Sequence, residues 1–313
     1  MFSLVMSLAD VSNHRGLATD FVVGFGNDAE VFKFPIPVLG GVNAEMIFGD
    51  LQESQSRDGF RIFEKDGLLI GAIDEVARAD LAGQTYRLYQ RLLGLVGGRR
   101  LVRVWNYVPG INAPDATGLE HYRAFCRGRS LAFEELLGED FREHLPAASA
   151  VGGIDGRLAV IFVATQAEPA HVENPEQVPA YEYPLEHGPR APSFARATQV
   201  AEAGRRYVFI SGTAAIKGHA TMAVGDLHGQ IACTLDNLRM ISIACDLGER
   251  LGEGAGWQRH FKVYLRHASD YDAAEKALEN TLFSAGDRVT WLHSDICRSA
   301  LLIEIEATLV ASM

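Results

Sequence analysis

The alternation of apolar and polar positions predicts two successive units of mixed strands and helices. Apolar residues at every second position, or in short runs, indicate strands, and apolar residues three or four positions apart indicate helices. The elements expected in the first unit are a strand over 61–73, a helix over 74–96, a strand over 100–108, a helix over 119–138 closed by Gly138, and a strand over 156–165. The buried stripe of the helix over 74–96 is expected to hold Val76, Leu81, Leu88, Leu92 and Leu95.

The second half of the chain repeats this order of elements. Its first helix carries apolar residues at helical spacing and is expected to stop at Gly248. No residue-level repeat accompanies the order, so the duplication is predicted for the architecture alone. The expected elements are a strand over 205–214, a helix over 229–248 with Ile231, Leu235, Leu238, Ile241 and Cys245 on one stripe, a strand over 260–266, a helix over 271–286, and strands over 287–295 and 300–310.

A proline-rich stretch separates the two halves. Residues 167–195 hold six of the eleven prolines, so this stretch can be neither the interior of a helix nor a central strand. A chain of 313 residues is also long enough for two hydrophobic cores. We therefore expect one domain over 1–166, a linker over 167–195 and a second domain over 196–313.

Composition and charge narrow the function classes. Apolar residues make up 48% and charged residues 22%, as in ordinary soluble globular proteins. The net charge of −11 argues against nucleic acid as a partner, because phosphate binding needs a basic face. The start of the chain lacks a basic segment followed by an apolar run, and no stretch approaches the roughly 18 to 20 apolar residues that span a bilayer. A cytoplasmic location without membrane contact is expected.

Cysteine and histidine spacing gives little support for a disulfide framework or a metal site. The four cysteines are widely spaced without a CxxC pair, and the ten histidines form no HExxH or HxH motif. Reduced thiols and no cofactor or metal are expected.

Two glutamates in an otherwise apolar strand are the first candidates for chemistry. In the strand over 300–310, side chains alternate between faces, so Glu304 and Glu306 share one face and Ile303 and Ile305 the other. If helices cover the apolar face, the glutamates face either solvent or a second packed layer. The pattern of this strand alone leaves both alternatives open.

Two further groups of polar residues could belong to a site. Tyr122 and Arg129 lie seven positions apart on the predicted helix, close to two turns, so they share a stripe with Cys126. Tyr183 and Arg196 flank the end of the linker. Taken singly, each of these residues is as well explained by packing as by function.

The second half resembles the RidA (YjgF) family of small α/β proteins. The resemblance rests on "YVFISGTAAIKGH", "GQIACTLDNLRMI" and "LLIEIEATLV", over roughly 115 residues. That family forms ligand sites between neighbouring subunits, so two such modules in one chain imply a site between domains. The implied fold class is α/β, of the α+β kind: two RidA/YjgF-like domains, each a mixed sheet with helices packed on one face.

A second resemblance covers roughly residues 60 to 313. "RVWNYVPGIN", "HYRAFCRGR", "LPAASAVGG", "NPEQVPAYEYP", "GPRAPSFARAT", "SGTAAIKGH" and "DICRSALLIEIEA", in this order, are similar to the chorismatase family, which cleaves chorismate and releases pyruvate. The resemblance implies an active site between the two domains, without a metal or an organic cofactor. Chorismate is the implied partner, and the chain is expected to be a monomer or a small homo-oligomer.

The resemblance also implies roles for individual residues. Glu304 matches the acid that protonates the substrate, although a shift of two positions would give that role to Glu306. Substrate-binding positions are matched by Tyr122, Arg129, Tyr183 and Arg196. A neutral carboxylic acid at pH 7 requires a raised pKa, which burial and a nearby like charge would both favour.

The product depends on the branch of the family. In the family, aromatising members have a cysteine where hydrolytic members have a small apolar residue, and that position is Cys297 here. This predicts a 3-hydroxybenzoate synthase, with 4-hydroxybenzoate as a further product. A second position that distinguishes the two branches holds glycine in aromatising members and alanine in hydrolytic members. In this chain Ala214 and Ala215 both lie near that position. The alternatives are a hydrolytic chorismatase that gives a dihydroxycyclohexadiene carboxylate, and a RidA-like imine deaminase or metabolite-binding regulator.

Overall fold

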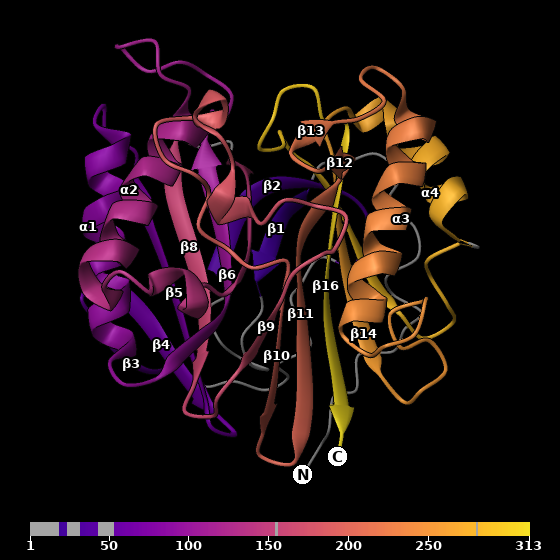
Figure 1. The fold of residues 1–313 in the computed structure, drawn as a ribbon, viewed down its shortest axis with the longest axis horizontal. Helices are drawn as coiled ribbons and strands as arrows, with labels where there is room; N and C mark the ends of the chain where they lie inside the picture. The colour runs from indigo at the N-terminus through magenta and orange to yellow at the C-terminus, as the bar shows by residue number, and fades with distance from the viewer. Residues whose placement is uncertain (1–18, 24–31, 43–52, 154–155, 280) are drawn as a thin grey trace.

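The protein folds into four layers, with two helices on each outer side of a pair of β-sheets packed face to face (Figure 1). The computed structural model describes residues 19–23, 32–42, 53–153, 156–279 and 281–313. None of the helices in these ranges is long and apolar enough to cross a membrane. The predicted α/β class, with two mixed sheets that each carry helices on one face, is confirmed.

The first sheet has six strands in the order β3-β4-β5-β8-β6-β7, and only the β6–β7 pair is parallel. Helices α1 and α2 follow β5 and β6 and cover its outer face. The strands are β3 (Glu53–Arg57), β4 (Phe60–Lys65), β5 (Leu68–Val76), β6 (Arg100–Pro109), β7 (Ala147–Gly153) and β8 (Arg157–Thr165), and the helices are α1 (Leu81–Val96), α2 (His121–Leu137) and the 3-10 turn η1 (Phe141–His144).

The second sheet has eight strands in the order β1-β2-β15-β14-β16-β11-β10-β9, and only the β14–β15 pair is parallel. Helices α3 and α4 cover its outer face. The strands are β1 (Thr19–Val23), β2 (Phe32–Gly41), β9 (Ala170–Val172), β10 (Ala197–Glu202), β11 (Arg205–Ala214), β14 (Gln258–Leu265), β15 (Arg288–His293) and β16 (Ile303–Ser312), with α3 (Leu227–Ala244) and α4 (Tyr271–Glu279). A hairpin of β12 (Ile216–Lys217) and β13 (Ala220–Thr221), and the 3-10 turns η2 (Ala180–Glu182), η3 (Leu185–His187) and η4 (Ala268–Asp270), complete the description.

The two halves share one topology, as the order of predicted elements indicated. A hairpin, helix, strand, helix, strand and strand follow each other in both halves, and the strands adopt the same order in the sheets, β4-β5-β8-β6-β7 and β10-β11-β16-β14-β15. In each half the only parallel pair is joined by the second helix, which is the crossover that a parallel connection requires.

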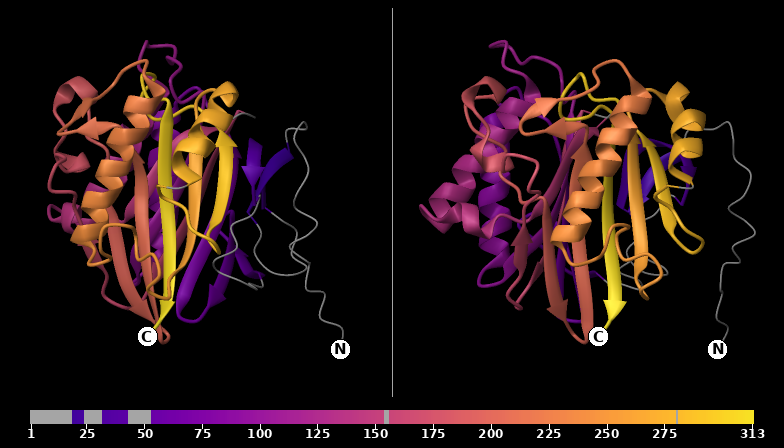
Figure 2. Two further views of the ribbon diagram at one scale, coloured as in Figure 1. Left: turned by 90° about the vertical axis from the view of Figure 1, so that its right-hand side faces the viewer. Right: turned by 45° about the vertical axis from the view of Figure 1, so that its right-hand side comes forward.

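The sheets do not follow the predicted division of the chain at 167–195. Strand β2 pairs with β15, and β9 pairs with β10, so residues 32–41 and 170–172 belong to the second sheet. Figure 2 shows the indigo strands of the N-terminal segment beside the orange strands of that sheet. Without β2, strand β15 would be an edge strand with unpaired backbone N–H and C=O groups. Pairing with β2 satisfies these groups, although β2 lies far from β15 in the sequence.

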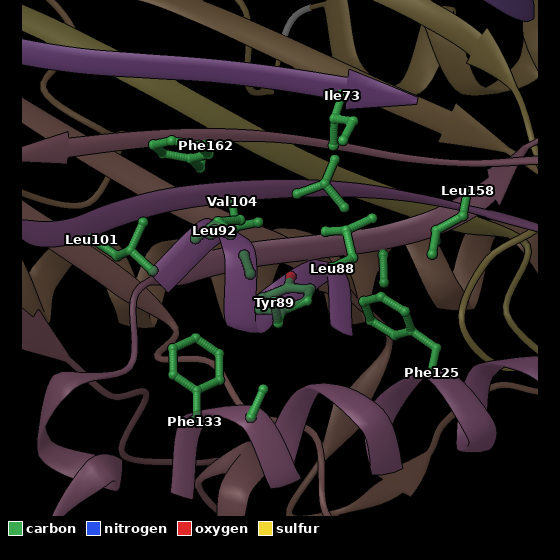
Figure 3. Close-up of a cluster of buried hydrophobic side chains, with 14 of the residues drawn as sticks. Ile73, Leu88, Tyr89, Leu92, Leu101, Val104, Phe125, Phe133, Leu158 and Phe162 are labelled. Carbon is green, nitrogen blue, oxygen red and sulfur yellow. The ribbon is translucent and has the colours of Figure 1, made fainter. Parts of the chain in front are cut away.

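The helices pack through apolar stripes on the outer faces of the sheets. Leu88, Tyr89 and Leu92 of α1 meet Phe125 and Phe133 of α2 over the first sheet (Figure 3). Each of these buried side chains contributes about 1.5–3 kcal/mol to folding. The Tyr89 hydroxyl donates to Asn106 Oδ1 of β6 at 2.5 Å, so its polar end is also satisfied.

Several predicted boundaries were wrong. Residues 61–73 form two strands, because Asp66 and Gly67 both adopt positive φ and make a two-residue hairpin turn. Helix α1 begins only at Leu81, after Asp80 accepts a hydrogen bond from the Gly83 amide as N-cap, and Val76 lies exposed at the end of β5.

The other helices and the last strand show smaller differences. Helix α2 ends before Gly138 as predicted, with the glycine at a φ of 82°. Helix α3 ends at Ala244, and Gly248 lies in the turn that follows. Helix α4 ends at Glu279, well short of 286, and β16 begins at Ile303.

Candidate active site

A cavity of about 360 Å³ opens at the end of the two sheets where the linker, β11, β16 and the loop before β16 meet. A smaller adjoining cavity of about 30 Å³ reaches toward α2 and β7. The six residues predicted for the site all line these spaces: Tyr122, Cys297 and Glu304 line both, Tyr183 and Arg196 the larger one, and Arg129 the smaller one.

Glu304 lies on the face of β16 that packs against the first sheet. It pairs with Tyr264 of β14 and Ala214 of β11 in the middle of the sheet, and only 3% of its surface is exposed. Its Oε1 atom has no hydrogen-bond partner in the described structure, and its Oε2 atom lies 4.0 Å from Cys297 Sγ. Burial, and then the charge of Glu306, raise the pKa of Glu304 to about 8.

Gly212 makes room for this carboxyl group. A Cβ atom at position 212 would lie 2.0 Å from Glu304 Oε1 and 3.2 Å from the Ser149 side chain. Glycine is therefore required on β11 for the carboxyl group to keep its place in the cavity.

Glu306 lies on the same face but in a different environment. It accepts hydrogen bonds from Arg103 Nη2 at 2.6 Å and Trp105 Nε1 at 2.7 Å, and its Oε1 lies 2.8 Å from Lys262 Nζ. Burial acts to raise its pKa, but Lys262 and Arg103 outweigh burial and the net effect lowers the pKa. Glu306 lines neither cavity and is an ionised partner of buried cations.

The strand pattern had left open whether the two glutamates face solvent. They do not, since the first sheet covers this face and both side chains are buried. The structure also separates the two candidates for the acid: the pKa of Glu304 is raised and its side chain lines the cavity, whereas the pKa of Glu306 is lowered and its carboxylate is paired with Arg103 and Lys262.

Arg129 is a buried cation that lines the smaller cavity together with Glu304. Its guanidinium lies 4.9 Å from the centre of the Phe125 ring, and only 2% of its surface is exposed. Among the described residues it has no carboxylate partner within 4.0 Å, and its Nε atom makes no hydrogen bond. A buried guanidinium without a counterion is suited to an anionic ligand.

Arg196 is held at the opposite wall by the linker. Its Nη2 donates to Tyr183 Oη at 2.7 Å and to the Val178 carbonyl at 3.2 Å. The nearest carboxylate, Glu173, lies 4.0 Å from Nε at the limit of an ion pair. Burial, opposed by the charge of Arg196, raises the pKa of Glu173 to about 7, so this carboxylate neutralises Arg196 only in part.

Two further arginines, Arg123 and Arg298, line the larger cavity and were not predicted from the sequence. Arg298 donates to the His219 carbonyl at 2.8 Å and to Thr221 Oγ1 at 3.1 Å, and its guanidinium lies 5.3 Å from the Tyr183 ring. It follows Cys297 in the loop before β16 and lines the larger cavity. The motif "DICRSALLIEIEA" contained it, but no spacing marked it as part of the site.

The Cys297 thiol and the Tyr122 phenol both have raised pKa values. Burial, and then the charge of Glu304, raise the pKa of the Cys297 thiol to about 12, and burial also raises the pKa of Tyr122. Cys297 is therefore a weak hydrogen-bond donor at neutral pH and is not prepared as a nucleophile. Besides Glu304 and the Cys297 thiol, the two cavities are lined by two phenols (Tyr122 and Tyr183), four guanidinium groups (Arg123, Arg129, Arg196 and Arg298) and the carboxyl groups of Glu120 and Glu186.

Comparisons with known proteins identify the family of the chain. Residues 47–164 match the family model described as "Chorismatase FkbO/Hyg5-like, N-terminal". A chorismatase from Streptomyces hygroscopicus is 38% identical over 263 residues, which is 81% of this chain and 75% of that protein. The chain belongs to the chorismatase family. The match to a crystal structure of a chorismatase covers 83% of this chain and 80% of that chain, with 35% sequence identity and a TM-score of 0.75.

Other relatives are similar over smaller parts. A 3-hydroxybenzoate synthase from Streptomyces hygroscopicus is 39% identical over 227 residues, and the match spans 70% of this chain and 66% of that protein. A YjgF-family protein from Neisseria meningitidis overlaps 39% of this chain at 18% identity, with a TM-score of 0.30. The membership in the chorismatase family predicted from seven separated motifs is thus confirmed.

Proposed function

We propose that this member of the chorismatase family cleaves chorismate into pyruvate and 3-hydroxybenzoate. The observation that carries the proposal is the uncharged, buried carboxyl group of Glu304, whose free oxygen faces a cavity lined by arginines. An enol ether is cleaved after a proton reaches its terminal carbon, and a carboxylic acid that keeps its proton at pH 7 can supply it.

The arginines supply what a dianionic substrate needs. Chorismate carries a carboxylate on its ring and another on its enolpyruvyl group, and guanidinium groups bind carboxylates through paired hydrogen bonds. Arg129 and Arg196 are the proposed partners of the two carboxylates, with Tyr122 and Tyr183 as further hydrogen-bond donors. Arg123 and Arg298 add further positive charge to the larger cavity.

Glu304 is the proposed proton donor. Its proton forms a new C–H bond at the terminal methylene carbon, and the ether carbon becomes an oxocarbenium-like cation of the kind that glycosidases stabilise. The carboxylate left on Glu304 lies near that positive charge and stabilises it electrostatically. The neighbouring ring hydroxyl then attacks the ring carbon that carries the ether oxygen, its proton returns to Glu304, and the bond between that carbon and the ether oxygen breaks so that pyruvate leaves. The resulting arene-oxide-like species opens, a hydrogen is lost from the ring carbon and gained by the oxygen, and the ring aromatises to 3-hydroxybenzoate. Together the two products contain the atoms of chorismate, so this route consumes no water.

Cys297 supports the aromatising branch. Its protonated thiol lies 4.0 Å from the acid and lines both cavities, where it can donate to the ring hydroxyl and occupy the space of an attacking water.

Ala214 favours a second candidate, the hydrolytic chorismatase. This residue lines the larger cavity, whereas Ala215 does not, and an alanine near this position is typical of hydrolytic members. That branch consumes one water and yields pyruvate and a dihydroxycyclohexadiene carboxylate. Membership in the chorismatase family favours both branches over a RidA-like imine deaminase or a metabolite-binding regulator.

The proposal is tested by incubating the purified protein with chorismate and measuring pyruvate and aromatic acid together. Equal amounts of pyruvate and 3-hydroxybenzoate are expected. Pyruvate with a non-aromatic diol would establish the hydrolytic branch instead, and chorismate that binds in calorimetry without any pyruvate release would reject both.

A further inference from the structure

Three side chains with metal-binding atoms converge at the rim of the cavity, outside the group assigned to catalysis. Glu186 and His187 come from the turn η3 of the linker, and His219 comes from the turn between β12 and β13. All three line the larger cavity. The cluster therefore connects the linker to the second half of the chain beside the opening of the site.

The distances between the three atoms match one face of a tetrahedral metal site. His187 Nε2 lies 3.0 Å from His219 Nδ1, and Glu186 Oε1 lies 3.3 Å from His219 Nδ1 and 3.4 Å from His187 Nε2. A zinc ion about 2.0–2.1 Å from each donor, with tetrahedral angles, sets the donor atoms roughly 3.3–3.4 Å apart. Only the contact between the two histidines needs to open slightly to admit an ion.

The two imidazoles face each other through ring nitrogens 3.0 Å apart, and the neutral imidazole is the form that binds metals.

We propose that Glu186, His187 and His219 bind one divalent ion of the zinc class at the mouth of the cavity. Two imidazoles and one carboxylate form a ligand set typical of zinc sites that keep the fourth position open for water or an anionic group. Arg298 and Arg123 act against a bound cation, so the affinity is weaker than in closed four-ligand structural sites. An ion here ties the linker to the β12–β13 hairpin and fixes one rim of the opening.

The proposal is tested without chorismate, so its outcome is independent of the catalytic assignment. Zn²⁺ is titrated into the tag-free protein against a chromophoric chelator, and one ion per chain is expected. His187→Gln and His219→Gln should each weaken Zn²⁺ binding at least tenfold. Even the loss of a residue that only hydrogen-bonds to a metal ligand lowers metal affinity by roughly 10- to 100-fold. His228→Gln, at an exposed histidine in α3, is the matched control and should bind like the parent protein.

Cobalt gives a second readout. Co²⁺ bound by the parent protein should show the intense visible absorption of four-coordinate geometry, and this absorption should be lost in the His187→Gln/His219→Gln double variant. Circular dichroism establishes that the variants are folded. Zn²⁺ affinity in the folded double variant within twofold of the parent value, or a weak six-coordinate cobalt spectrum in the parent protein, would overturn the proposal.

Discussion

Replacing Glu306 by glutamine is expected to lower the pH at which Glu304 loses its proton. Glu306 is the second cause, after burial, of the raised pKa of Glu304. Glutamine keeps the shape but removes the negative charge, and its single side-chain oxygen can accept from only one of Arg103 and Trp105, which donate to different oxygens of Glu306. The positive charges of Arg103 and Lys262 are then no longer offset by Glu306, and this favours the ionised form of Glu304 still further.

The size of this effect follows from the strand geometry. Glu304 and Glu306 are two residues apart on one face of β16, so their side chains are separated by about 7 Å. At an effective dielectric constant of about 20, two unit charges at that distance repel by roughly 2 kcal/mol, which corresponds to a pKa change of about 1.5 to 2. The pKa of Glu304 should therefore fall from about 8 to between roughly 6 and 6.5.

The assay is the pH dependence of kcat/KM for chorismate. The parent protein should lose activity as pH rises through about 8, because Glu304 must carry its proton in the free enzyme. In Glu306→Gln this loss should occur at a pH lower by about 1.5 to 2. Glu306→Asp keeps the charge and is the control, so its loss of activity should stay near the parental pH.

Folding has to be checked in the same series, since a buried ion pair that loses one partner costs about 3–5 kcal/mol. Glu306→Gln combined with Lys262→Met also removes one of the buried cations that pair with Glu306 and should restore much of that stability. A folded Glu306→Gln variant, single or combined, whose activity is lost at the parental pH would refute the electrostatic coupling between the two glutamates.

Four further outcomes are expected. Glu304→Gln removes the transferable proton and should lower kcat by about 10²- to 10⁴-fold or more, with chorismate still bound in calorimetry; near-parental turnover would mean another acid acts. Cys297→Ala should divert product from 3-hydroxybenzoate toward the diol, and an unchanged product ratio would remove the thiol from branch selection. Gly212→Ala places a Cβ atom 2.0 Å from Glu304 Oε1 and should reduce turnover strongly, whereas Gly98→Ala, with no atom within 4 Å, should not. Folding raises the pKa of Glu304 from 4.5 to about 8. The contribution of Glu304 to the free energy of unfolding therefore falls as pH rises between these values, by roughly 1 kcal/mol per pH unit. Urea unfolding at several pH values should show a smaller fall in the free energy of unfolding for Glu304→Gln than for the parent protein.

The sequence predicted the elements that carry a strong local pattern. Helix α2 and its stop at Gly138, strand β11 and the two faces of β16 were all visible in the spacing of apolar residues. Strand β7, "AASAVGG", consists of small residues without alternation, and its place is set by pairing with β6. The pairing of β2 with β15 joins residues about 250 positions apart, and no local pattern contains that information.

The site shows the same division between local and long-range information. Alternation along β16 placed Glu304 and Glu306 on one face, but the difference between them comes from Arg103, which lies 203 positions away from Glu306 in the chain. The six predicted residues came together because the family resemblance linked distant motifs. His187 and His219 belong to no short metal motif, since their contact depends on where the linker crosses the β12–β13 hairpin.

The central claim is that Glu304 is a neutral carboxylic acid at physiological pH. The most direct measurement is a pH titration of the carboxyl carbon of Glu304 by nuclear magnetic resonance, with protein labelled with ¹³C in glutamate and the signal assigned by its absence in Glu304→Gln. We predict a midpoint near pH 8. A midpoint near the ordinary glutamate value of about 4.3 would contradict the account, because the proposed acid would then carry no proton to donate at pH 7.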